Sequence, residues 1–175
     1  MTPVTAPFFD QAVARLETAA MPDAERVQRL GVVRAALDWL GTPYHPHARV
    51  KGAGCDCATL LAEVYEAASV RERVVLGYYS PQWHLHQDED LYLQRLGGYA
   101  HRAPESHAPL PGDIALFQFG RSPSHGAIVL DWPLVIHAYI GKGVVIEEVD
   151  KSPLIIAKNR ELSEGRFHSL WTLWS

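Results

Sequence analysis

The stretch from Gly41 to Tyr65 reads GTPYHPHARVKGAGCDCATLLAEVY, and the fold prediction starts from it. A glycine-rich loop ends at Asp56, a residue type that caps helix N-termini well, and the run from Cys57 to Ala68 has helical spacing. Cys57 is therefore predicted to be the first residue of a helix. The N-terminus of a helix carries about half a positive elementary charge, so we expect this position to lower the pKa of the Cys57 thiol.

Two amphipathic helices are predicted before this loop. The first covers Phe8–Ala20 and stops before Pro22, because a proline ring cannot continue a helix. The second covers Ala24–Leu40 and ends at Gly41. Its apolar residues recur at spacings of three and four, which predicts one face buried against a core. That face consists of Val27, Leu30, Val33, Leu37 and Leu40.

After the helix at Cys57 the pattern changes from helices to strands. A short amphipathic helix is expected at Asp88–Leu96. Short aliphatic and aromatic runs separated by turn residues then predict antiparallel strands at Ile114–Phe119, His125–Leu130, Leu134–Ile140, Val144–Val149 and Arg166–Trp174. Helices followed by a meander indicate an α+β fold, with helices packed on an antiparallel sheet of about five strands. We expect a single domain over 1–175, with residues 1–30 as an N-terminal helical extension.

Composition excludes several classes of protein. The chain has 175 residues and a formal net charge of −4, which argues against a general nucleic-acid binder. Its apolar runs fall short of the roughly twenty residues that a membrane span needs. Residues Met1–Asp10 lack the basic and apolar regions of a signal peptide, so we expect synthesis in the cytoplasm. Cys55 and Cys57 are separated by one residue, too close for an unstrained disulfide.

The residues that carry chemistry are a cysteine and two histidines. A cysteine nucleophile needs a nearby imidazole and a group that orients that imidazole. His125 and His137 lie on neighbouring predicted strands joined by a short turn. Because cross-strand partners on one face of a sheet lie about 5 Å apart, these strands can bring the two rings together. Cys57, His125 and His137 are therefore candidates for nucleophile, base and orienting group.

Several segments in this order resemble the NlpC family of cell-wall cysteine peptidases, which have a papain-like fold. The stretch from Gly41 to Tyr65 is similar to the nucleophile region of that family, and PGDIALF, HGAIVL and VIHA are similar to its strands. Together these pieces reach from Gly41 to Ala138. The segment YYSPQWHLHQDEDLYLQRL, at 78–96, further resembles the subgroup associated with phage tails and prophages.

The resemblance implies a role for each matching residue. Cys57 would be the nucleophile, His125 the general base, and His137 the residue that holds the imidazole in its working tautomer. Tyr44 would help to form the oxyanion site, together with the backbone N–H of Cys57. Asp56 would contact the free amine of a stem peptide, although a plain helix cap is an equal reading of that residue. The resemblance implies no metal or cofactor.

The same resemblance implies a substrate. Enzymes of this family typically cut the bond between γ-D-glutamate and a diamino acid in peptidoglycan stem peptides. Ala58–Thr59 replaces the Ser-Gly of many relatives, which leaves the N-terminal residue of the substrate open. Without a signal peptide, a phage tail, a lysis event or a partner protein would have to deliver the enzyme to the wall. Phage tail proteins are thus expected partners, in addition to the stem peptide.

Two other interpretations remain open at this point. His45, His47, Cys55 and Cys57 form an H-x-H and C-x-C set that would read as zinc ligands, although both spacings are tighter than those of structural zinc sites. The chain could also be a catalytically silent tail or assembly module that kept the fold. His84 and His86 are expected at the surface or at a pocket rim. Tyr78, Tyr79 and Trp83 belong either to the core or to a substrate groove.

Overall fold

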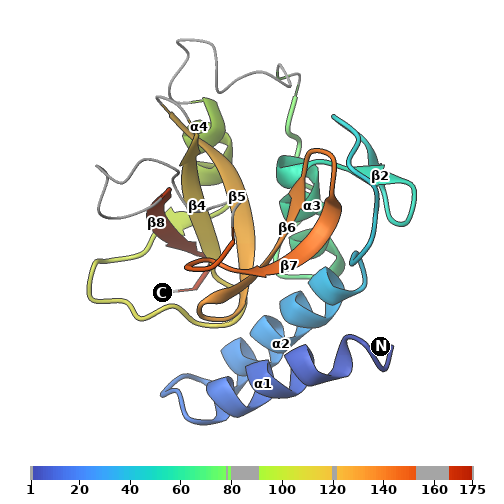
Figure 1. Ribbon diagram of the computed structural model, residues 1–175. Coiled ribbons are helices and arrows are strands. Elements are labelled where there is room, and N and C mark those ends of the chain that lie inside the picture. Colours follow the sequence, from blue (N-terminus) through green and yellow to red (C-terminus); the bar gives the residue numbers. More distant parts are fainter. Residues whose placement is uncertain (1, 78, 80–90, 120–121, 153–165, 175) are drawn as a thin grey trace.

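An antiparallel sheet of six strands forms the centre of the computed structural model, in the order β3-β8-β4-β5-β6-β7 (Figure 1). The structure describes residues 2–77, 79, 91–119, 122–152 and 166–174. The strands are β3 His101–Arg102, β4 Ile114–Phe119, β5 Ser122–Asp131, β6 Leu134–Tyr139, β7 Gly143–Glu148 and β8 Phe167–Thr172. The predicted strands are all present, and the short β3 adds one. The predicted α+β fold is therefore confirmed.

Helices cover one face of this sheet. They are α1 Ala6–Glu17, α2 Asp23–Leu37, α3 Cys57–Ala67 and α4 Leu91–Gly97, and a small hairpin of β1 Arg49–Val50 and β2 Gly54–Cys55 precedes α3. Helix α3 begins at Cys57, as predicted. Helix α2 ends at Leu37, earlier than the predicted end at Leu40. Gly41 lies in the turn that follows, with a φ of +81°. The predicted start of α4 at Asp88 lies outside the described residues, as do Tyr78, Trp83, His84 and His86.

The buried face of α2 differs from the predicted one. Val27 is 69% exposed, so its place in the buried stripe was wrong. Arg29 is buried in its stead at 1% exposure. Its guanidinium forms an ion pair of 2.9 Å with the buried Asp113 and donates to the carbonyl of Pro111 at 3.0 Å. Periodicity located the helix but overlooked that a paired cation can occupy a core position.

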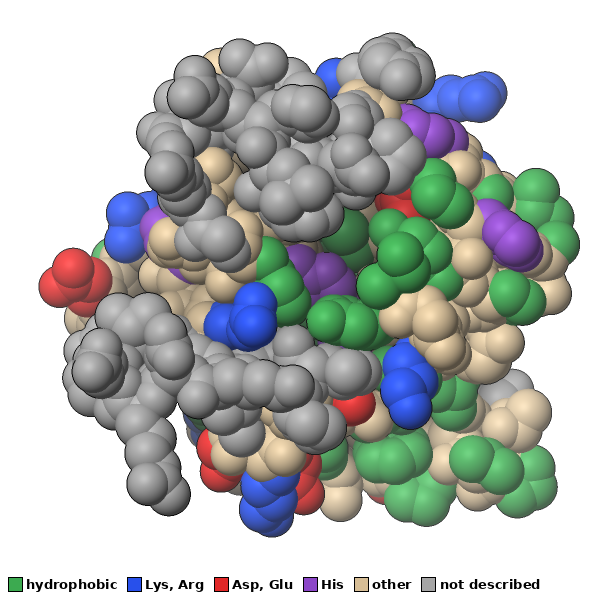
Figure 2. All heavy atoms as spheres, turned by 45° about the horizontal axis from the view of Figure 1, so that its top comes forward, with side chains coloured by type: hydrophobic (Ala, Val, Ile, Leu, Met, Phe, Trp, Pro, Cys, Tyr) green, Lys and Arg blue, Asp and Glu red, His purple; other side chains and the backbone are tan. Residues whose placement is uncertain are grey.

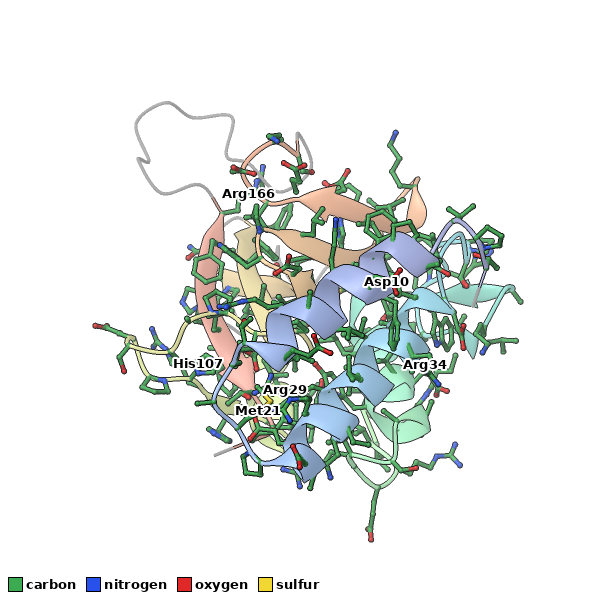
Figure 3. All side chains as sticks on the ribbon, turned by 90° about the horizontal axis from the view of Figure 1, so that it is seen from below. Asp10, Met21, Arg29, Arg34, His107 and Arg166 are labelled. Atoms are coloured by element: carbon green, nitrogen blue, oxygen red, sulfur yellow. The ribbon has the colours of Figure 1, made fainter. Side chains whose placement is uncertain are left out.

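Two apolar clusters lie on the two faces of the sheet. The larger one joins α1, α2 and α3 to the sheet, and Phe9 and Ala12 of α1 belong to it. The smaller one lies on the opposite face and consists of Ala115, Phe117, Ala127, Val129 and Val135. Seen from below, α1 and α2 lie side by side across the molecule (Figure 3). Within the described residues, no helix is both long and apolar enough to cross a lipid bilayer.

Candidate active site

Asp56 fixes the start of α3. Its Oδ1 accepts hydrogen bonds from the backbone N–H groups of Ala58 at 3.0 Å and Thr59 at 2.9 Å, and its own N–H donates to Thr59 Oγ1 at 2.8 Å. This reciprocal capping box satisfies N–H groups that a helix end leaves unpaired. The other oxygen, Oδ2, accepts from the His47 N–H at 2.7 Å and the Tyr79 hydroxyl at 2.6 Å. Asp56 is therefore a helix cap that also anchors two loops.

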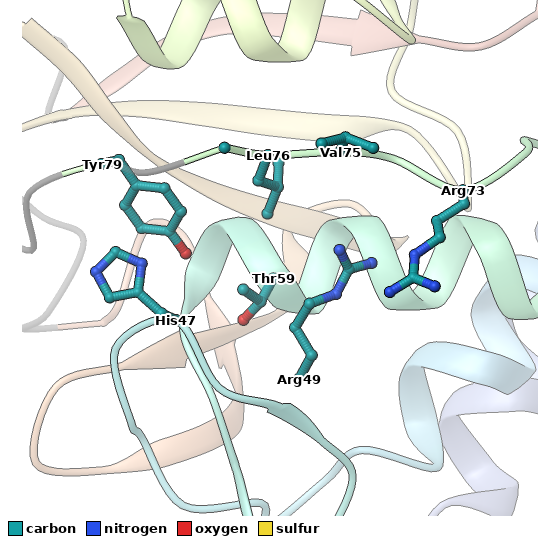
Figure 4. Close-up of a pocket in the computed structure, with 8 residues that line it drawn as sticks. His47, Arg49, Thr59, Arg73, Val75, Leu76 and Tyr79 are labelled. Carbon is teal, nitrogen blue, oxygen red and sulfur yellow. The ribbon is translucent and has the colours of Figure 1, made fainter.

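A cavity of about 370 Å³ adjoins this cap (Figure 4). His47 and Tyr79 stand at one end of it, Thr59 of α3 lies in the middle, and Arg49 and Arg73 stand at the other end. Arg49 is already paired with Glu63 and Glu66. Asp56 itself is 2% exposed and is not among the described residues that line the cavity, and its Oδ2 already accepts from the Tyr79 hydroxyl.

Cys57 follows the cap, and its sulfur faces the backbone of β5. The thiol donates toward the carbonyl of Ser124 at 4.0 Å. The N–H groups of Gly126 and Ala58 and the hydroxyl of Tyr92 lie close enough to the sulfur to lower the pKa of the thiol. The sulfur thus touches the residues on both sides of His125. In the part of the chain that the structure describes, no hydrogen bond joins Cys57 to His125 itself.

The thiol of Cys57 is less acidic than the helix start predicted. Burial, and after it the neighbouring Asp56 carboxylate, raise its pKa to about 12, because the nearby Gly126, Tyr92 and Ala58 groups offset only part of this increase. Cys57 is 6% exposed, so water cannot stabilise the thiolate. The prediction of a lowered pKa was wrong, because it considered the helix end without burial or the adjacent carboxylate. The Cys57 thiol is therefore neutral in this structure at neutral pH.

A β-bulge explains how β5 meets the sulfur. His125 pairs with Phe117 of β4, but Pro123 pairs with Gln118, so Ser124 is an extra residue in β5. Bulges bend a strand and re-aim its groups, and here the bulged residue turns its carbonyl toward Cys57. The pairing of β5 with β6 runs only from Asp131 to Ile128. The N–H of Gly126, beyond the end of that ladder, is thereby available to the sulfur.

Gly126 also leaves room for Tyr92. A Cβ at Gly126 would collide with the Tyr92 hydroxyl and would lie 2.8 Å from Cδ1 of Leu61. Tyr92 comes from α4 and is 5% exposed. Burial, with Cys57 as a further cause, keeps the pKa of Tyr92 well above its ordinary value, so the hydroxyl stays a donor. The sequence pattern gave no sign of this contact, because α4 lies far from Cys57 in the chain.

The structure brings His125 and His137 together. Nε2 of His125 and Nδ1 of His137 are 2.7 Å apart, and both rings are buried. Nε2 of His137 lies 3.2 Å from Oε2 of Glu147 on β7, which also accepts from the Ser152 hydroxyl. Partial burial raises the pKa of Glu147, but the hydrogen bonds from His137 and Ser152 bring it below its ordinary value. Glu147 is therefore an ionised acceptor that sequence reasoning missed.

This chain of contacts sets the tautomers. An ionised Glu147 can only accept, so Nε2 of His137 carries a proton. Nδ1 of His137 then accepts a hydrogen bond from the Nε2–H group of His125. Nδ1 of His125 is left without a proton, as a general base requires. Burial, His137 and Arg166, in that order, hold the pKa of His125 well below its ordinary 6.5.

Tyr44 and Cys55 lie beside each other in the segment before Cys57. Tyr44 forms an isolated β-bridge with Cys55 and is half-buried. Burial raises the pKa of Tyr44, followed by the charges of Cys57 and Asp56, which places the phenol near the nucleophile. Cys55 is buried, and burial raises its pKa to about 12. Among the described residues, no group of three or more His, Cys, Asp or Glu side chains could hold a metal ion, so the H-x-H and C-x-C set does not converge.

The face that Figure 2 shows is hollowed at its middle, where hydrophobic and histidine side chains come to the surface. Rings of Phe119 and Tyr139 surround His125, with centroids 5.4 Å and 5.8 Å from its own, both edge-on. Figure 3 shows α1 and α2 from below, whereas Figure 2 turns the top of the molecule forward. The N-terminal helices therefore lie away from this hollow.

Comparisons with known proteins show the fold. No protein-family model and no curated protein matches the chain. Among solved structures, the chain is similar to the peptidoglycan hydrolase RipB of Mycobacterium tuberculosis, with 16% identity and a TM-score of 0.53 over 96% of this chain and 79% of that one. It is similar to an NLP/P60 family protein from Staphylococcus aureus, with 17% identity and a TM-score of 0.54 over 89% of this chain and 43% of that one.

NlpC2 of Trichomonas vaginalis is a third similar structure, with 18% identity and a TM-score of 0.53 over 90% of this chain. The chain spans 51% of that protein and 43% of the staphylococcal one, so it corresponds to a part of each. The chain therefore has the papain-like α+β fold of the NlpC/p60 domains.

Proposed function

We propose that this chain is a cysteine peptidase that hydrolyses a peptide bond in bacterial peptidoglycan. The observation that carries the proposal is the contact between His125 Nε2 and His137 Nδ1 at 2.7 Å, which leaves His125 Nδ1 as a base. The nucleophile candidate faces the backbone on both sides of that base. A similar structure, RipB, is named a peptidoglycan hydrolase, which supports the substrate class.

The reaction follows from these positions. The hydrogen bond from the Cys57 thiol to the Ser124 carbonyl is broken, and His125 takes the thiol proton while the sulfur attacks the amide carbon. The backbone N–H of Cys57 and the Tyr44 hydroxyl stabilise the oxyanion. The amine leaves with the proton from His125, and a thioester remains on Cys57. Water, activated by His125, then releases the new carboxylate and restores the thiol.

The neutral resting thiol fits this order of events. In the free enzyme the thiol pKa of about 12 and the weakly basic His125 both disfavour an ion pair. Proton transfer is therefore coupled to substrate binding rather than completed beforehand. Geometry in free enzymes often tightens only with substrate bound, and the Cys57–His125 contact is expected to form at that stage.

The proposed bond lies between γ-D-glutamate and the diamino acid of a stem peptide. The resemblance of the segment from Gly41 to Tyr65 to cell-wall peptidases supports this choice. The cavity beside Asp56 offers a place for the free amine of a short stem peptide, at the cost of the Tyr79 hydrogen bond.

We also propose that a phage tail carries the enzyme to the wall. This rests on the resemblance of 78–96 to the tail-associated subgroup, and most of that segment lies outside the described residues. Purified tail particles should contain the chain, detected by mass spectrometry. Its absence from intact particles that carry all other tail proteins would overturn this delivery route.

Mass spectrometry of stem peptides and muropeptides tests the activity. Wild type should release a product cut after γ-D-glutamate, and Cys57→Ala should release none. Cys55→Ser is the matched control, because Cys55 is also buried and free but lies in the β1–β2 hairpin rather than at the start of α3. It should keep most of the activity. Equal loss in both variants would contradict the role of Cys57, and inactivity of folded, reduced wild type on every wall fragment would favour a silent assembly module.

A further inference from the structure

Arg166 lies near the proposed base and forms no ion pair with any carboxylate of the described residues. It precedes β8, and its carbonyl accepts from the Gln118 N–H at 2.7 Å, which holds this part of the chain against β4. Its guanidinium carbon is 4.2 Å from the centre of the Phe119 ring. The Phe119 ring packs edge-on to His125 at 5.4 Å between centroids. One aromatic ring therefore separates the cation from the base.

One buried donor of Arg166 has no hydrogen-bond partner. The side chain is half-buried, and its Nε is a buried atom without a hydrogen-bond partner. No carboxylate of the described residues forms an ion pair with it. Burying a donor of a charged group without a partner is costly, and such groups in proteins ordinarily find one. An unpaired guanidinium beside a base is therefore better explained by a ligand than by the fold.

The position of Arg166 indicates which part of a substrate it meets. In the proposed reaction His125 gives its proton to the leaving amine. Side chains next to His125, such as Phe119 and Arg166, are then expected near the substrate residue that supplies this amine. The cavity lined by His47, Thr59 and Tyr79 adjoins α3 instead, and we assign it to the acyl side of the substrate. A planar guanidinium with several N–H donors matches a carboxylate in two parallel hydrogen bonds.

We propose that Arg166 binds a free carboxylate on the residue that follows the cleaved bond, and so selects substrates that carry one. The proposal rests on the proposed function, because it takes His125 as the base that protonates the leaving amine. In a diamino acid the carboxylate could be the α-carboxylate or a second one on the side chain. Both offer the same chemistry to the guanidinium.

Binding would also adjust the base. The positive charge of Arg166 disfavours protonation of His125, and a bound carboxylate cancels that charge. His125 therefore becomes a stronger base when the right substrate is present. A substrate with an amide in place of the carboxylate leaves the base weak. Selection would then act on catalysis as well as on binding.

The test is a cycle of variants and substrates. Wild type, Arg166→Gln and Arg166→Lys are compared on a stem peptide with free carboxylates and on peptides amidated at the α-carboxyl, at the side-chain carboxyl or at both. Wild type should lose roughly 10- to 100-fold in kcat/KM when the recognised carboxylate is amidated, the size of one hydrogen-bonded charge pair. Arg166→Gln should show that loss already with the free peptide and no further loss on amidation. The peptide whose single amide reproduces the loss identifies the carboxylate.

Arg102→Gln is the matched control. Arg102 is exposed on β3, which pairs with the same strand β8, and its charge acts on His168 rather than on His125. This variant should keep the wild-type preference. Arg166→Lys keeps the charge without the planar fork and should keep part of the preference. Equal preference for free and amidated peptides in wild type, or an unchanged preference in folded Arg166→Gln, would overturn the proposal.

A second measurement separates this proposal from the proposed function. In a Cys57→Ala background no turnover is needed, and NMR follows the titration of His125 with and without an uncleaved carboxylate peptide. The peptide should raise the His125 pKa with Arg166 present and leave it unchanged in Arg166→Gln. If wild type cleaves no wall fragment but this shift occurs, the proposed reaction fails and the carboxylate site stands. No shift with a bound peptide would overturn the site.

Discussion

Two arginines at opposite ends of the sheet are held in contrasting ways. Arg29 of α2 is buried at 1% exposure. Its guanidinium donates hydrogen bonds to Glu25, Asp113, the Pro111 carbonyl and Thr172. Its guanidinium also stacks on the Trp174 ring at 4.1 Å. Arg166 lies over one aromatic ring as well, but its Nε has no acceptor.

The difference separates a structural cation from one kept for a ligand. Arg29 ties α2 to the start of β4 and the end of β8, so the N-terminal helices and the sheet depend on it. The side chain of Arg166 stacks on Phe119 but forms no ion pair with a described residue, and its charge lowers the pKa of His125. The experiments below test whether the two ends of the molecule divide stability and chemistry in this way.

The largest effect is expected at the structural end. Arg29→Met leaves Oδ1 of the buried Asp113 without its cation, while Oδ2 keeps His107 and the Leu110 N–H, and should lower the free energy of unfolding by about 3–5 kcal/mol. Urea unfolding measures this, and Arg26→Met is the control on the same helix. Arg26 pairs with an exposed Asp23, so its loss should cost less than about 1 kcal/mol. Activity per folded molecule of Arg29→Met should match wild type, and a selective loss of activity would break the comparison.

Low pH should reduce the stability that depends on His125, which lies at the same end of the sheet as Arg166. The folded pKa of His125 lies well below 6.5, so between that pKa and 6.5 the unfolded chain binds the proton and the folded chain does not. Stability from this group is therefore complete above pH 6.5 and is lost as the pH falls, by at most about 1.4 kcal/mol per pH unit.

His125→Gln should reduce this dependence and also lower turnover by roughly 10²- to 10⁴-fold, the usual contribution of a general base. Urea unfolding of wild type and variant at a series of pH values measures the first effect. Identical slopes below pH 6.5 in both proteins would show that His125 is not held neutral by the fold.

The smallest effect is expected for the stability of Arg166→Gln. Only a partly exposed contact with Phe119 is lost, and such contacts contribute about 0.5–1 kcal/mol. The variant also removes a buried donor that has no partner, which is favourable and opposes that loss. The free energy of unfolding should therefore change by less than about 1 kcal/mol. A loss comparable to that of Arg29→Met would make Arg166 a structural residue and remove the contrast.

Local patterns predicted the elements and the histidine pair. The turn between β5 and β6 is short, so the pairing that joins His125 to His137 could be inferred from the sequence. Glu147, Tyr92 and Arg166 could not be found in this way. Their contacts depend on which strand follows β6, where α4 packs and how β8 returns beside β4, and these are long-range outcomes of packing.

The errors have equally specific causes. Val27 fits the helical period of α2 as well as its buried neighbours do, and only the ion pair with Asp113 shows why Arg29 turns inward instead. The thiol pKa was inferred from the helix end alone. Desolvation outweighs that local field once Leu61, Tyr92 and β5 close around the sulfur.

The early end of the ladder between β5 and β6 has a consequence for local opening. Backbone pairing stops at Ile128 and Ile136, and beyond that point the side-chain hydrogen bond between His125 and His137 holds the strands together. Amide protons of β5 near Gly126 should therefore exchange with solvent faster than those near Val129, and faster still when His137 is removed. The His125–His137 hydrogen bond therefore also joins β5 to β6 beyond the end of their backbone ladder, so the site and these strand ends should open together.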